Sequence, residues 1–448
     1  MTLLGFFEWL NGDVIALPGS LLFLGSALIL TIKTGFIQLR GFPSFIRIVA
    51  NLATNKSTGK KGQFDQTKSQ TISPMRALLS ALAQSIGMGS VVGPTVAIMK
   101  GGPGALFWLL IYIFLASATK FTEVTFALQT RERTADGHVI GGPMQYLKII
   151  HPALAFWYGC VMAILFMGWS GLQSNTLAGI LALESVPNWL VGIVLAALAL
   201  ATLSGGVKRV GQVASKLVPL MFVLYVSFAL YIIFQNPLAL QNALLLLKRS
   251  AFTPAAAMGG FWGASVFLAI RYGVFRGIYI SEAGLGTASI PHAVSDTKTP
   301  VNQGLLAMGS VVSDLFLSTL SGLLVLVTGV WIRGEERATL IYEVFKDYAP
   351  VTGQIVLITS ISLFILTTII ANSFNGSQSF ASLTRHRWVK FYIAVTGVAI
   401  FLGTLIPVPL AWEILDTLLF SAAVPNLIGL IYLAFKYPQV LWLKNASV

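Results

Sequence analysis

Apolar runs of roughly 20 residues recur from one end of the chain to the other and constrain the fold more than any other feature, because helices of this length cross the hydrocarbon core of a bilayer. Only 10% of the 448 residues are charged and the mean hydropathy is +0.80, whereas soluble domains carry about 25% charged residues. The sequence therefore predicts an all-α polytopic membrane protein with about 11 transmembrane helices. We expect these helices at residues 13–35, 77–100, 104–129, 153–181, 188–204, 214–235, 251–280, 302–331, 351–375, 390–406 and 411–435.

The net charge of +13 is distributed unevenly over the predicted loops. Cytoplasmic loops of membrane proteins carry an excess of lysine and arginine, and here most of these residues fall on one side. This asymmetry predicts a multi-pass protein of the cell (inner) membrane, with its N-terminus outside and its C-terminal tail, 436–448, in the cytoplasm. It also explains the basic composition without a nucleic-acid partner. The six basic loop residues on the other side are Lys100, Lys248, Arg249, Arg333, Arg337 and Lys346.

The ends and the rare residue types exclude several functional classes. No basic residue precedes the first apolar run, so we expect a permanent helix and not a cleaved signal peptide. A single cysteine, Cys160, cannot form an intrachain disulfide. The histidines lie in predicted loops without metal-ligand spacing, so we expect no cofactor and no metal centre beyond a coupling ion. They are His138, His151, His292 and His386.

The second predicted helix, 77–100, is interrupted by residues that break helices. Gly87, Met88, Gly89 and Ser90 follow one another, and Gly93-Pro94 comes soon after. In lipid every backbone N–H and C=O needs a partner, so an interrupted helix survives only where the freed groups face protein, a watery cavity or a ligand. The interruption therefore predicts a binding site.

The seventh predicted helix, 251–280, is also rich in glycine, at Gly259, Gly260, Gly263 and Gly273. Five helices separate the starts of the two glycine-rich segments, so they run in opposite directions across the membrane. This is the arrangement of an inverted-topology repeat. The alternative is that these glycines only permit close helix packing.

The repeat hypothesis divides the chain into five parts. We expect an accessory N-terminal helix within 1–50 and a cytoplasmic loop at 51–73. Two five-helix repeats would follow at 74–235 and 251–435, and the tail would complete the chain.

Motifs in one consistent order resemble the alanine or glycine:cation symporter family, also called the sodium:alanine symporter family. They extend from residue 73 to residue 426, and the Glu-Ala-Gly-Leu-Gly stretch is specific. They are Ser73-Pro74, Gly87-Met88-Gly89, Lys100-Gly101-Gly102-Pro103-Gly104, Thr119-Lys120-Phe121 with Glu123, Gly141-Gly142-Pro143, Gly205-Gly206-Val207-Lys208-Arg209, Arg276-Gly277, Glu282-Ala283-Gly284-Leu285-Gly286, His292-Ala293, Gln303-Gly304, Asp314 and Pro425-Asn426.

This resemblance implies a fold similar to the bacterial leucine transporter, with a 5+5 inverted-repeat core, discontinuous helices and one added N-terminal helix. It implies a secondary active symporter, not an enzyme, that imports a small neutral amino acid such as alanine or glycine with sodium by alternating access. An ion channel would need a filter loop or rings of charge, and the sequence contains neither pattern.

Three positions depart from the family's usual residues. Ser90 replaces an asparagine, Ile280-Ser281 replaces Ser-Asn, and Leu315 replaces a threonine. Each change alters a hydroxyl or amide at a position that could face a cation. The alternative reading is therefore a proton-coupled or otherwise altered small-solute permease of the same fold.

An amino-acid zwitterion needs donors for its carboxylate, and the N-terminus of the outgoing half-helix offers free N–H groups. We expect Gly87, Met88, Gly89 and Ser90 at the substrate, with glycine allowing close approach of the backbone.

The resemblance adds a sodium site formed by carbonyls at Ala83 and Ile86 with hydroxyls of Thr367 and Thr368, and it places Thr367 at the substrate as well. The alternative for the two threonines is bonding to their own helix.

Polar and aromatic residues on two further helices complete the predicted substrate site. Gly168, Gln173 and Asn175 form a polar insert in the fourth helix, and the family has a glutamine and an asparagine at matching places. On the seventh helix Phe261, Trp262 and Gly263 are candidates to cap a small side-chain pocket. Interhelical hydrogen bonding and packing are the alternatives.

Ionisable residues inside membrane segments are costly and usually paired or functional. Lys120 and Glu123 lie three residues apart, so we expect a structural pair. Asp314 is an ion-binding candidate; ligating a cation, relaying a proton and bonding a neighbouring helix all remain open. Glu282 is expected at the cytoplasmic end of its helix, in a gate or a helix-turn contact.

Overall fold

The computed structural model describes residues 2–54, 71–134, 137–252, 266–333 and 340–446. Helices dominate this part of the chain, and a two-stranded antiparallel hairpin pairs Glu132 with Ile140 and Arg133 with Val139. The helices are α1 (Leu3–Trp9), α2 (Ala16–Lys33), α3 (Ile37–Arg40), α4 (Phe42–Thr54), α5 (Pro74–Ser85), α6 (Met88–Gly101), α7 (Gly104–Gln129), α8 (Pro143–Tyr146), α9 (Pro152–Ala182), α10 (Asn188–Leu203), α11 (Gly206–Phe234), α12 (Pro237–Ser250), α13 (Val266–Ser281), α14 (Ser289–Ala293), α15 (Pro300–Thr328), α16 (Leu340–Tyr348), α17 (Thr352–Thr384), α18 (Val389–Gly403) and α19 (Pro409–Lys436); the strands are β1 (Glu132–Arg133) and β2 (Val139–Ile140).

Seven helical stretches of the described residues are long and apolar enough to cross a membrane, and the bent pair α5 and α6 makes an eighth. The two helices α10 and α18 are apolar but shorter. The all-helical membrane fold is thus confirmed, while the count of eleven spans and the division into repeats stay predictions. The seven stretches are Leu3–Lys33, Gly104–Gln129, Pro152–Ala182, Gly206–Phe234, Pro300–Thr328, Thr352–Thr384 and Pro409–Lys436.

Local sequence explains where several helices begin and end. Ser73 caps α5 by accepting a hydrogen bond from the Arg76 N–H, and a proline occupies the first turn of α5, α9, α12, α15 and α19. Proline fits there because its missing N–H would be unpaired anyway. The first membrane helix starts ten residues before its predicted start, since α1 continues into α2 through a π-helical turn at Leu10–Ile15.

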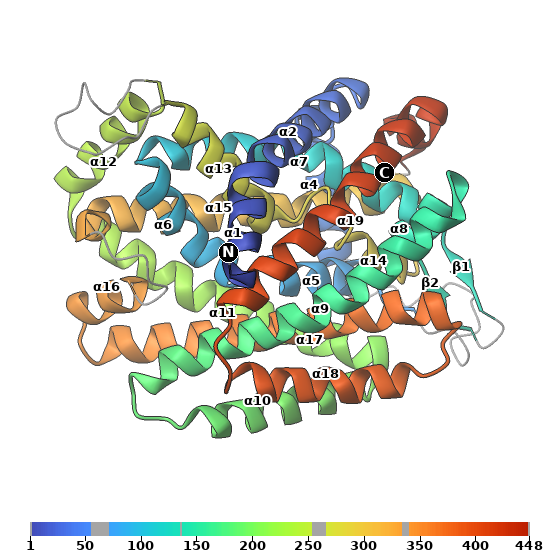
Figure 1. The fold of residues 1–448 in the computed structure, drawn as a ribbon. Coiled ribbons are helices and arrows are strands. Elements are labelled where there is room, and N and C mark those ends of the chain that lie inside the picture. The colour runs from blue at the N-terminus through green and yellow to red at the C-terminus, as the bar shows by residue number, and fades with distance from the viewer. Residues whose placement is uncertain (1, 55–70, 135–136, 253–265, 334–339, 447–448) are drawn as a thin grey trace.

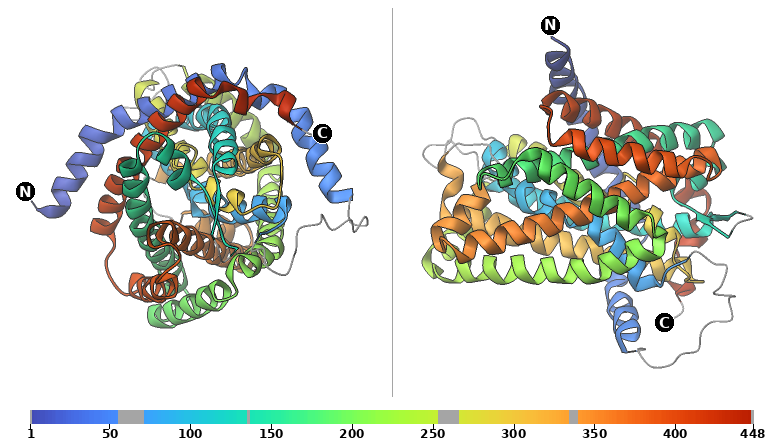
Figure 2. Two further views of the ribbon diagram at one scale, coloured as in Figure 1. Left: turned by 90° about the vertical axis from the view of Figure 1, so that its right-hand side faces the viewer. Right: turned by 90° about the horizontal axis from the view of Figure 1, so that it is seen from below.

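The helices form a bundle in which α9 packs along α17, α18 and α19, and α7 packs along α13 and α15 (Figure 1). The N-terminal α2 lies beside α19 at the edge of the bundle (Figure 2). The short α5 contacts α11, α14, α15 and α17 and lies in the middle. The interrupted helix is therefore surrounded by protein, as the backbone argument requires.

Three of the described helices with at least nine residues lie outside the predicted spans. α4 continues past the expected boundary at residue 50, α12 fills the linker between the proposed repeats, and α16 precedes α17. None of them interrupts the bundle.

A second interruption, which the glycine pattern did not predict, follows α13. α13 ends at Ser281, and the chain then turns through Glu282, Gly284 and Gly286, whose φ angles are 51°, 99° and 80°. The short buried α14 follows this turn. We call residues 282–288 the second break. The left-handed conformation at two positions explains the glycines of the Glu-Ala-Gly-Leu-Gly stretch.

The prediction that Gly273 belongs to a break is wrong, because α13 is continuous through it. A Cβ at this position would lie 2.4 Å from the Ala105 carbonyl oxygen and 2.9 Å from the Leu109 nitrogen. The glycine therefore lets α13 approach the backbone of α7. The other predicted break residues, Gly259, Gly260 and Gly263, lie outside the described residues.

The substitution Gly273→Ala should lower the free energy of unfolding by about 1–3 kcal/mol, as overpacking against a rigid backbone does. Thermal unfolding of the purified protein in detergent measures this. Gly179→Ala on α9 is the control, because a Cβ there meets nothing within 4 Å. Equal stability of the two variants would contradict the packing role.

Candidate functional site

The first interruption separates α5 from α6 by a bend of 40°. Ile86 ends α5, and Gly87 is extended, with φ −136° and ψ −161°. α6 then starts at Met88, so the N–H groups of its first turn, including that of Gly89, have no acceptor within the helix. They carry the positive end of the helix dipole toward the space beside the bend.

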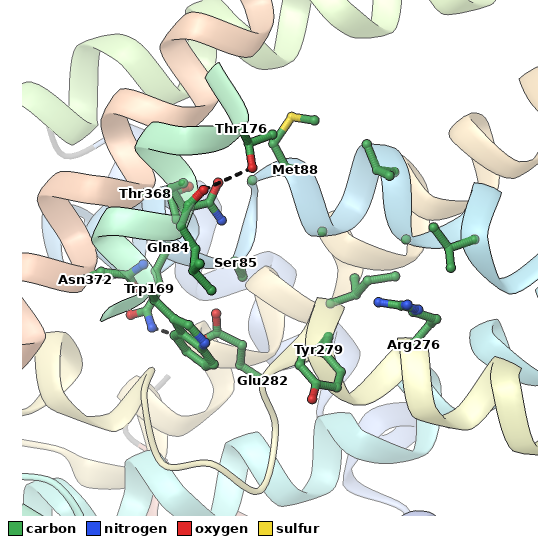
Figure 3. A pocket seen from close by; sticks show the side chains of 18 of the residues that line it. Gln84, Ser85, Met88, Trp169, Thr176, Arg276, Tyr279, Glu282, Thr368 and Asn372 are labelled. Carbon is green, nitrogen blue, oxygen red and sulfur yellow. Dashed lines mark hydrogen bonds between the residues drawn. The ribbon is translucent and has the colours of Figure 1, made fainter. Parts of the chain in front are cut away.

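A cavity of about 230 Å³ opens beside this bend (Figure 3). It has space for roughly seven water molecules at about 30 Å³ each. Five parts of the fold form its wall: the α5–α6 pair, α9, α13 with the start of the second break, α17 and α19. The lining residues are Gln84, Ser85, Gly87, Met88, Gly89, Val92, Gly93, Val96, Trp169, Leu172, Gln173, Thr176, Arg276, Tyr279, Ile280, Glu282, Thr368, Asn372 and Trp412.

A polar network joins the two breaks at this cavity. The Glu282 Oε2 atom accepts hydrogen bonds from Gln84 Nε2 at 2.7 Å and from the Thr287 hydroxyl at 2.6 Å. The Asn375 amide donates to Gln84 Oε1. The Glu282 side chain is 8% exposed, and Figure 3 shows it beside Trp169 at the cavity.

Several polar atoms of the lining residues remain without partners in the described structure. They include the amide oxygens of Gln173 and Asn372, Nε of Arg276 and the Tyr279 hydroxyl. Buried polar groups normally find hydrogen bonds. Unpaired donors and acceptors around one hollow therefore indicate a polar ligand.

A second contact links α5 to α17. The Thr368 hydroxyl lies 3.3 Å from the Ala83 carbonyl oxygen, although it also reaches the Phe364 carbonyl of its own helix at 2.8 Å. A Cβ on Gly87 would lie 2.7 Å from the same hydroxyl. The expected bond of Thr368 to its own helix is therefore present, and its hydroxyl also meets the Ala83 carbonyl.

Comparison with known proteins decides the family. A sequence profile of the sodium:alanine symporter family matches residues 5–442. The chain belongs to this family. Its motifs predicted this assignment, and the family is one of transporters that carry amino acids with cations.

Named relatives cover nearly the whole symporter. The sodium/alanine symporter AgcS of Methanococcus maripaludis is 32% identical over 429 residues, which are 92% of this chain and 91% of that protein. An uncharacterized transporter of Haemophilus influenzae is 33% identical over 439 residues, covering 96% and 94%. The probable sodium/glutamine symporter GlnT of Bacillus subtilis is 29% identical over 425 residues, covering 92% and 84%.

Solved structures show the fold. MhsT in complex with L-phenylalanine superposes with a TM-score of 0.62 at 14% identity, covering 85% of this chain and 93% of that one. A Na⁺-coupled sialic acid symporter superposes with a TM-score of 0.57 at 12% identity, covering 93% of each chain. The symporter therefore has the leucine-transporter fold.

The symporter brings only part of the predicted substrate set to the cavity. Gly87, Met88, Gly89 and Gln173 line it. Ser90 does not; it is buried and donates to the Ser85 carbonyl at 3.2 Å. Phe261, Trp262 and Gly263 lie outside the described residues.

Three more predicted residues make structural contacts away from the cavity. Gly168 packs α9 against α19, because a Cβ there would meet the Leu415 side chain at 2.7 Å. Asn175 donates to the Gly403 carbonyl at 2.8 Å. Thr367 donates to Leu363 of its own helix at 2.9 Å. Of the proposed carbonyl ligands, Ala83 contacts Thr368, and Ile86 is buried where α5 ends.

The predicted pair of Lys120 and Glu123 does not form within the described part of the chain. Lys120 Nζ donates to the Ser281 carbonyl at 2.5 Å. Glu123 Oε1 accepts from the N–H groups of Gly284 at 2.8 Å and Gly286 at 2.9 Å. Both side chains have structural contacts as expected, but they form hydrogen bonds with the backbone at and just before the second break, and not with each other. Backbone groups that leave helical geometry inside a bilayer need such partners.

Among the histidines, His292 differs from the expectation of a loop position. It lies in α14, is buried, and contacts the Gln303 amide at 2.6 Å. His138 and His386 lie outside helices, as expected, and stack with ring centroids 4.2 Å apart. Glu282 lies just past the end of α13 and makes the expected helix-turn contact with Thr287, and it also lines the cavity.

Arg131, just after α7, supports the connection that follows α14. Its guanidinium donates to the carbonyls of Ala293 at 3.0 Å and Thr297 at 2.8 Å. Burial lowers the pKa of this arginine from its ordinary value, yet an arginine stays charged at neutral pH. The connection is thus held by charge-assisted bonds.

Sequence reasoning missed most of the polar lining. Gln84, Trp169, Arg276 and Asn372 were not among the candidates. Gln84, Arg276 and Asn372 carried a usable signal, since polar residues within apolar segments are costly and mark pathways. Trp169 carried none, because aromatic residues in membrane helices are common.

Gly89→Val should reduce substrate affinity at least 100-fold while the protein still folds. The nearest atom to a Cβ at Gly89 is 3.8 Å away, so the new side chain would occupy the cavity without displacing its walls. Binding of labelled alanine to purified protein, with size-exclusion profiles as the folding control, measures this. Normal binding by the variant would place the ligand elsewhere.

Proposed function

We propose that this symporter imports a small neutral amino acid, such as alanine or glycine, together with sodium by alternating access. The observation that carries the proposal is the cavity at the α5–α6 bend, where a helix N-terminus and the Glu282 carboxyl line the same hollow. These two features have opposite polarity. A zwitterion is the ligand class that satisfies both.

The substrate carboxylate would lie against the first N–H groups of α6, near Met88 and Gly89. Helix N-termini bind anions because their N–H groups are unpaired and the dipole is positive there. The ammonium group would lie toward Glu282, and the free oxygens of Gln173 and Asn372 supply further acceptors. This assignment orients the amino acid along the cavity.

The cavity's size and wall support a small neutral side chain. At about 230 Å³, it is smaller than the 300–1,000 Å³ typical of sites for drug-sized ligands. The cavity is lined by the aromatic side chains of Trp169, Tyr279 and Trp412 and by the aliphatic side chains of Val92 and Val96. A charged side chain would lose its hydration against these surfaces.

Sodium would bind between α5 and α17, with the Ala83 carbonyl and the Thr368 hydroxyl as ligands. Hard cations prefer oxygen ligands. Gly87 fits this assignment, because any side chain there would collide with the Thr368 hydroxyl. The site borders the cavity through Gly87 and Thr368, so occupancy by the ion would favour the bent helix that receives the substrate.

We further propose a bacterial or archaeal cell membrane as the location, with the N-terminus outside and the C-terminus cytoplasmic, on the charge asymmetry of the loops. Proton coupling is the second candidate. A relative in Bacillus subtilis, 31% identical over 462 residues, is named a putative sodium/proton-dependent alanine carrier.

Uptake of labelled alanine into proteoliposomes tests the function. An inward sodium gradient should accumulate alanine above the external concentration, whereas an equal proton gradient without sodium should not. Accumulation driven by protons alone would favour the second candidate. Uptake indifferent to both gradients would contradict coupled transport.

Glu282→Gln should weaken alanine binding about 10- to 100-fold, because hydrogen bonds to charged groups are worth roughly 1.5–3 kcal/mol. The amide keeps the volume and can still contact Thr287 and Gln84. Equilibrium binding at saturating sodium isolates this effect. If this variant bound alanine with wild-type affinity, the substrate ammonium would not contact Glu282.

Thr368→Ala should raise the sodium concentration for half-maximal uptake roughly tenfold, as expected for one lost ligand. Thr367→Ala is the matched control, since the Thr367 hydroxyl bonds to carbonyls of its own helix and to the Met221 sulfur. Sodium titration of uptake compares the two variants. Equal shifts would contradict a ligand role specific to Thr368.

A further inference from the structure

The buried charges of the described residues do not balance. Apart from His292 and tyrosines, the buried acidic and basic side chains there are Lys120 and three carboxyls, those of Glu123, Glu282 and Asp314. Lys120 is an electrostatic neighbour of all three carboxyls. One positive charge thus faces three acidic groups, and uncompensated buried charge is very costly.

Two of the three carboxyls have hydrogen-bond donors that stabilise their charge. Glu123 accepts from Gly284, Gly286 and the Asn426 amide. Glu282 accepts from a glutamine and a threonine, and under the proposed function it also meets the substrate ammonium. These contacts explain why both carboxylates are tolerated in the bundle.

Asp314 differs from both. It lies in the middle of α15 with no exposed surface, and neither of its oxygens has a hydrogen-bond partner among the described residues. The Ser85 hydroxyl is a neighbour of this carboxyl, but neither group has a hydrogen-bond partner of good geometry among the described residues. Ser318, one turn further along α15, is buried with its hydroxyl unpaired as well.

Four unpaired oxygens therefore gather on one face of α15 and the end of α5. Hard cations take oxygen ligands at about 2.3–2.6 Å, so two ligands of one ion lie roughly 3–5 Å apart, mostly beyond hydrogen-bonding distance. A protonated carboxyl would instead need an acceptor within reach of its own O–H. Asp314 and Ser85 are neighbours whose oxygens are not hydrogen-bonded, which fits oxygens that face a shared ion.

We propose that Asp314, with the hydroxyls of Ser85 and Ser318, binds a second sodium ion that is transported with the amino acid. This proposal rests on the proposed function and deepens it. Its ligands differ from those of the Thr368 site. Ser85 also lines the cavity, so the ion would lie close enough to the substrate to couple their binding. The expected stoichiometry is two sodium ions for each amino acid.

The test measures the ratio of labelled sodium to labelled alanine taken up by proteoliposomes. Asp314→Asn keeps the volume and removes the charge, so the ratio should fall from two to one. Ser310→Ala is the control, because Ser310 is equally buried on α15 but bonds to its own helix at 2.8 Å. It should keep the wild-type ratio.

A wild-type ratio in Asp314→Asn would overturn the proposal, whether the carboxyl is permanently protonated or carries a transported proton. If that variant does not fold or transport, Ser318→Ala decides: sodium for half-maximal uptake should rise three- to tenfold, and an unchanged value overturns the site. Failure of sodium-driven uptake in the wild type would instead contradict the proposed function, so the two failures are distinguishable.

Discussion

The need to pair backbone groups inside a bilayer governs this structure. Helices satisfy their own N–H and C=O groups, but the described part of the chain leaves helical geometry in the centre of the bundle at Gly87 and at the second break. Each departure exposes peptide dipoles where water is scarce. Glu123 binds N–H groups of the second break, and Lys120 binds the carbonyl of Ser281 just before it. The ionisable residues of α7 thus make the irregular segment possible.

The same constraint creates the site. Side chains that form hydrogen bonds with the backbone at a helix break are polar. They place charges and unpaired polar atoms in the centre of an apolar bundle. At the first bend the pairing is incomplete, and the cavity lies there. Glu282 connects the two regions, because it contacts Gln84 beside one bend and Thr287 within the other. A movement of one bend therefore changes the hydrogen bonds that Glu282 makes at the other.

Glycine has two separate uses in this chain, and the sequence does not distinguish them. Gly284 and Gly286 adopt left-handed conformations that side chains rarely accept. Gly273 lies within a regular helix and allows the backbone of α7 to approach. Counting glycines therefore included Gly273, which belongs to a continuous helix. The motif Glu-Ala-Gly-Leu-Gly was expected at the end of this helix and does follow the end of α13, but the sequence did not predict the left-handed turn that it forms there.

Sequence alone determined the membrane class, the family, the first helix interruption and the candidates Gly87, Gly89, Gln173 and Thr368, because hydropathy, helix breakers and ordered motifs are local properties of the chain. Only the tertiary structure decided which side chains face the cavity. Thr367 and Thr368 are neighbours in the chain and both bond to their own helix, yet successive residues of a helix point about 100° apart, so the first also meets Met221 of α11 and the second meets Ala83 of α5. Which face of a helix meets a cavity depends on the helices packed around it, and no local pattern contains that information.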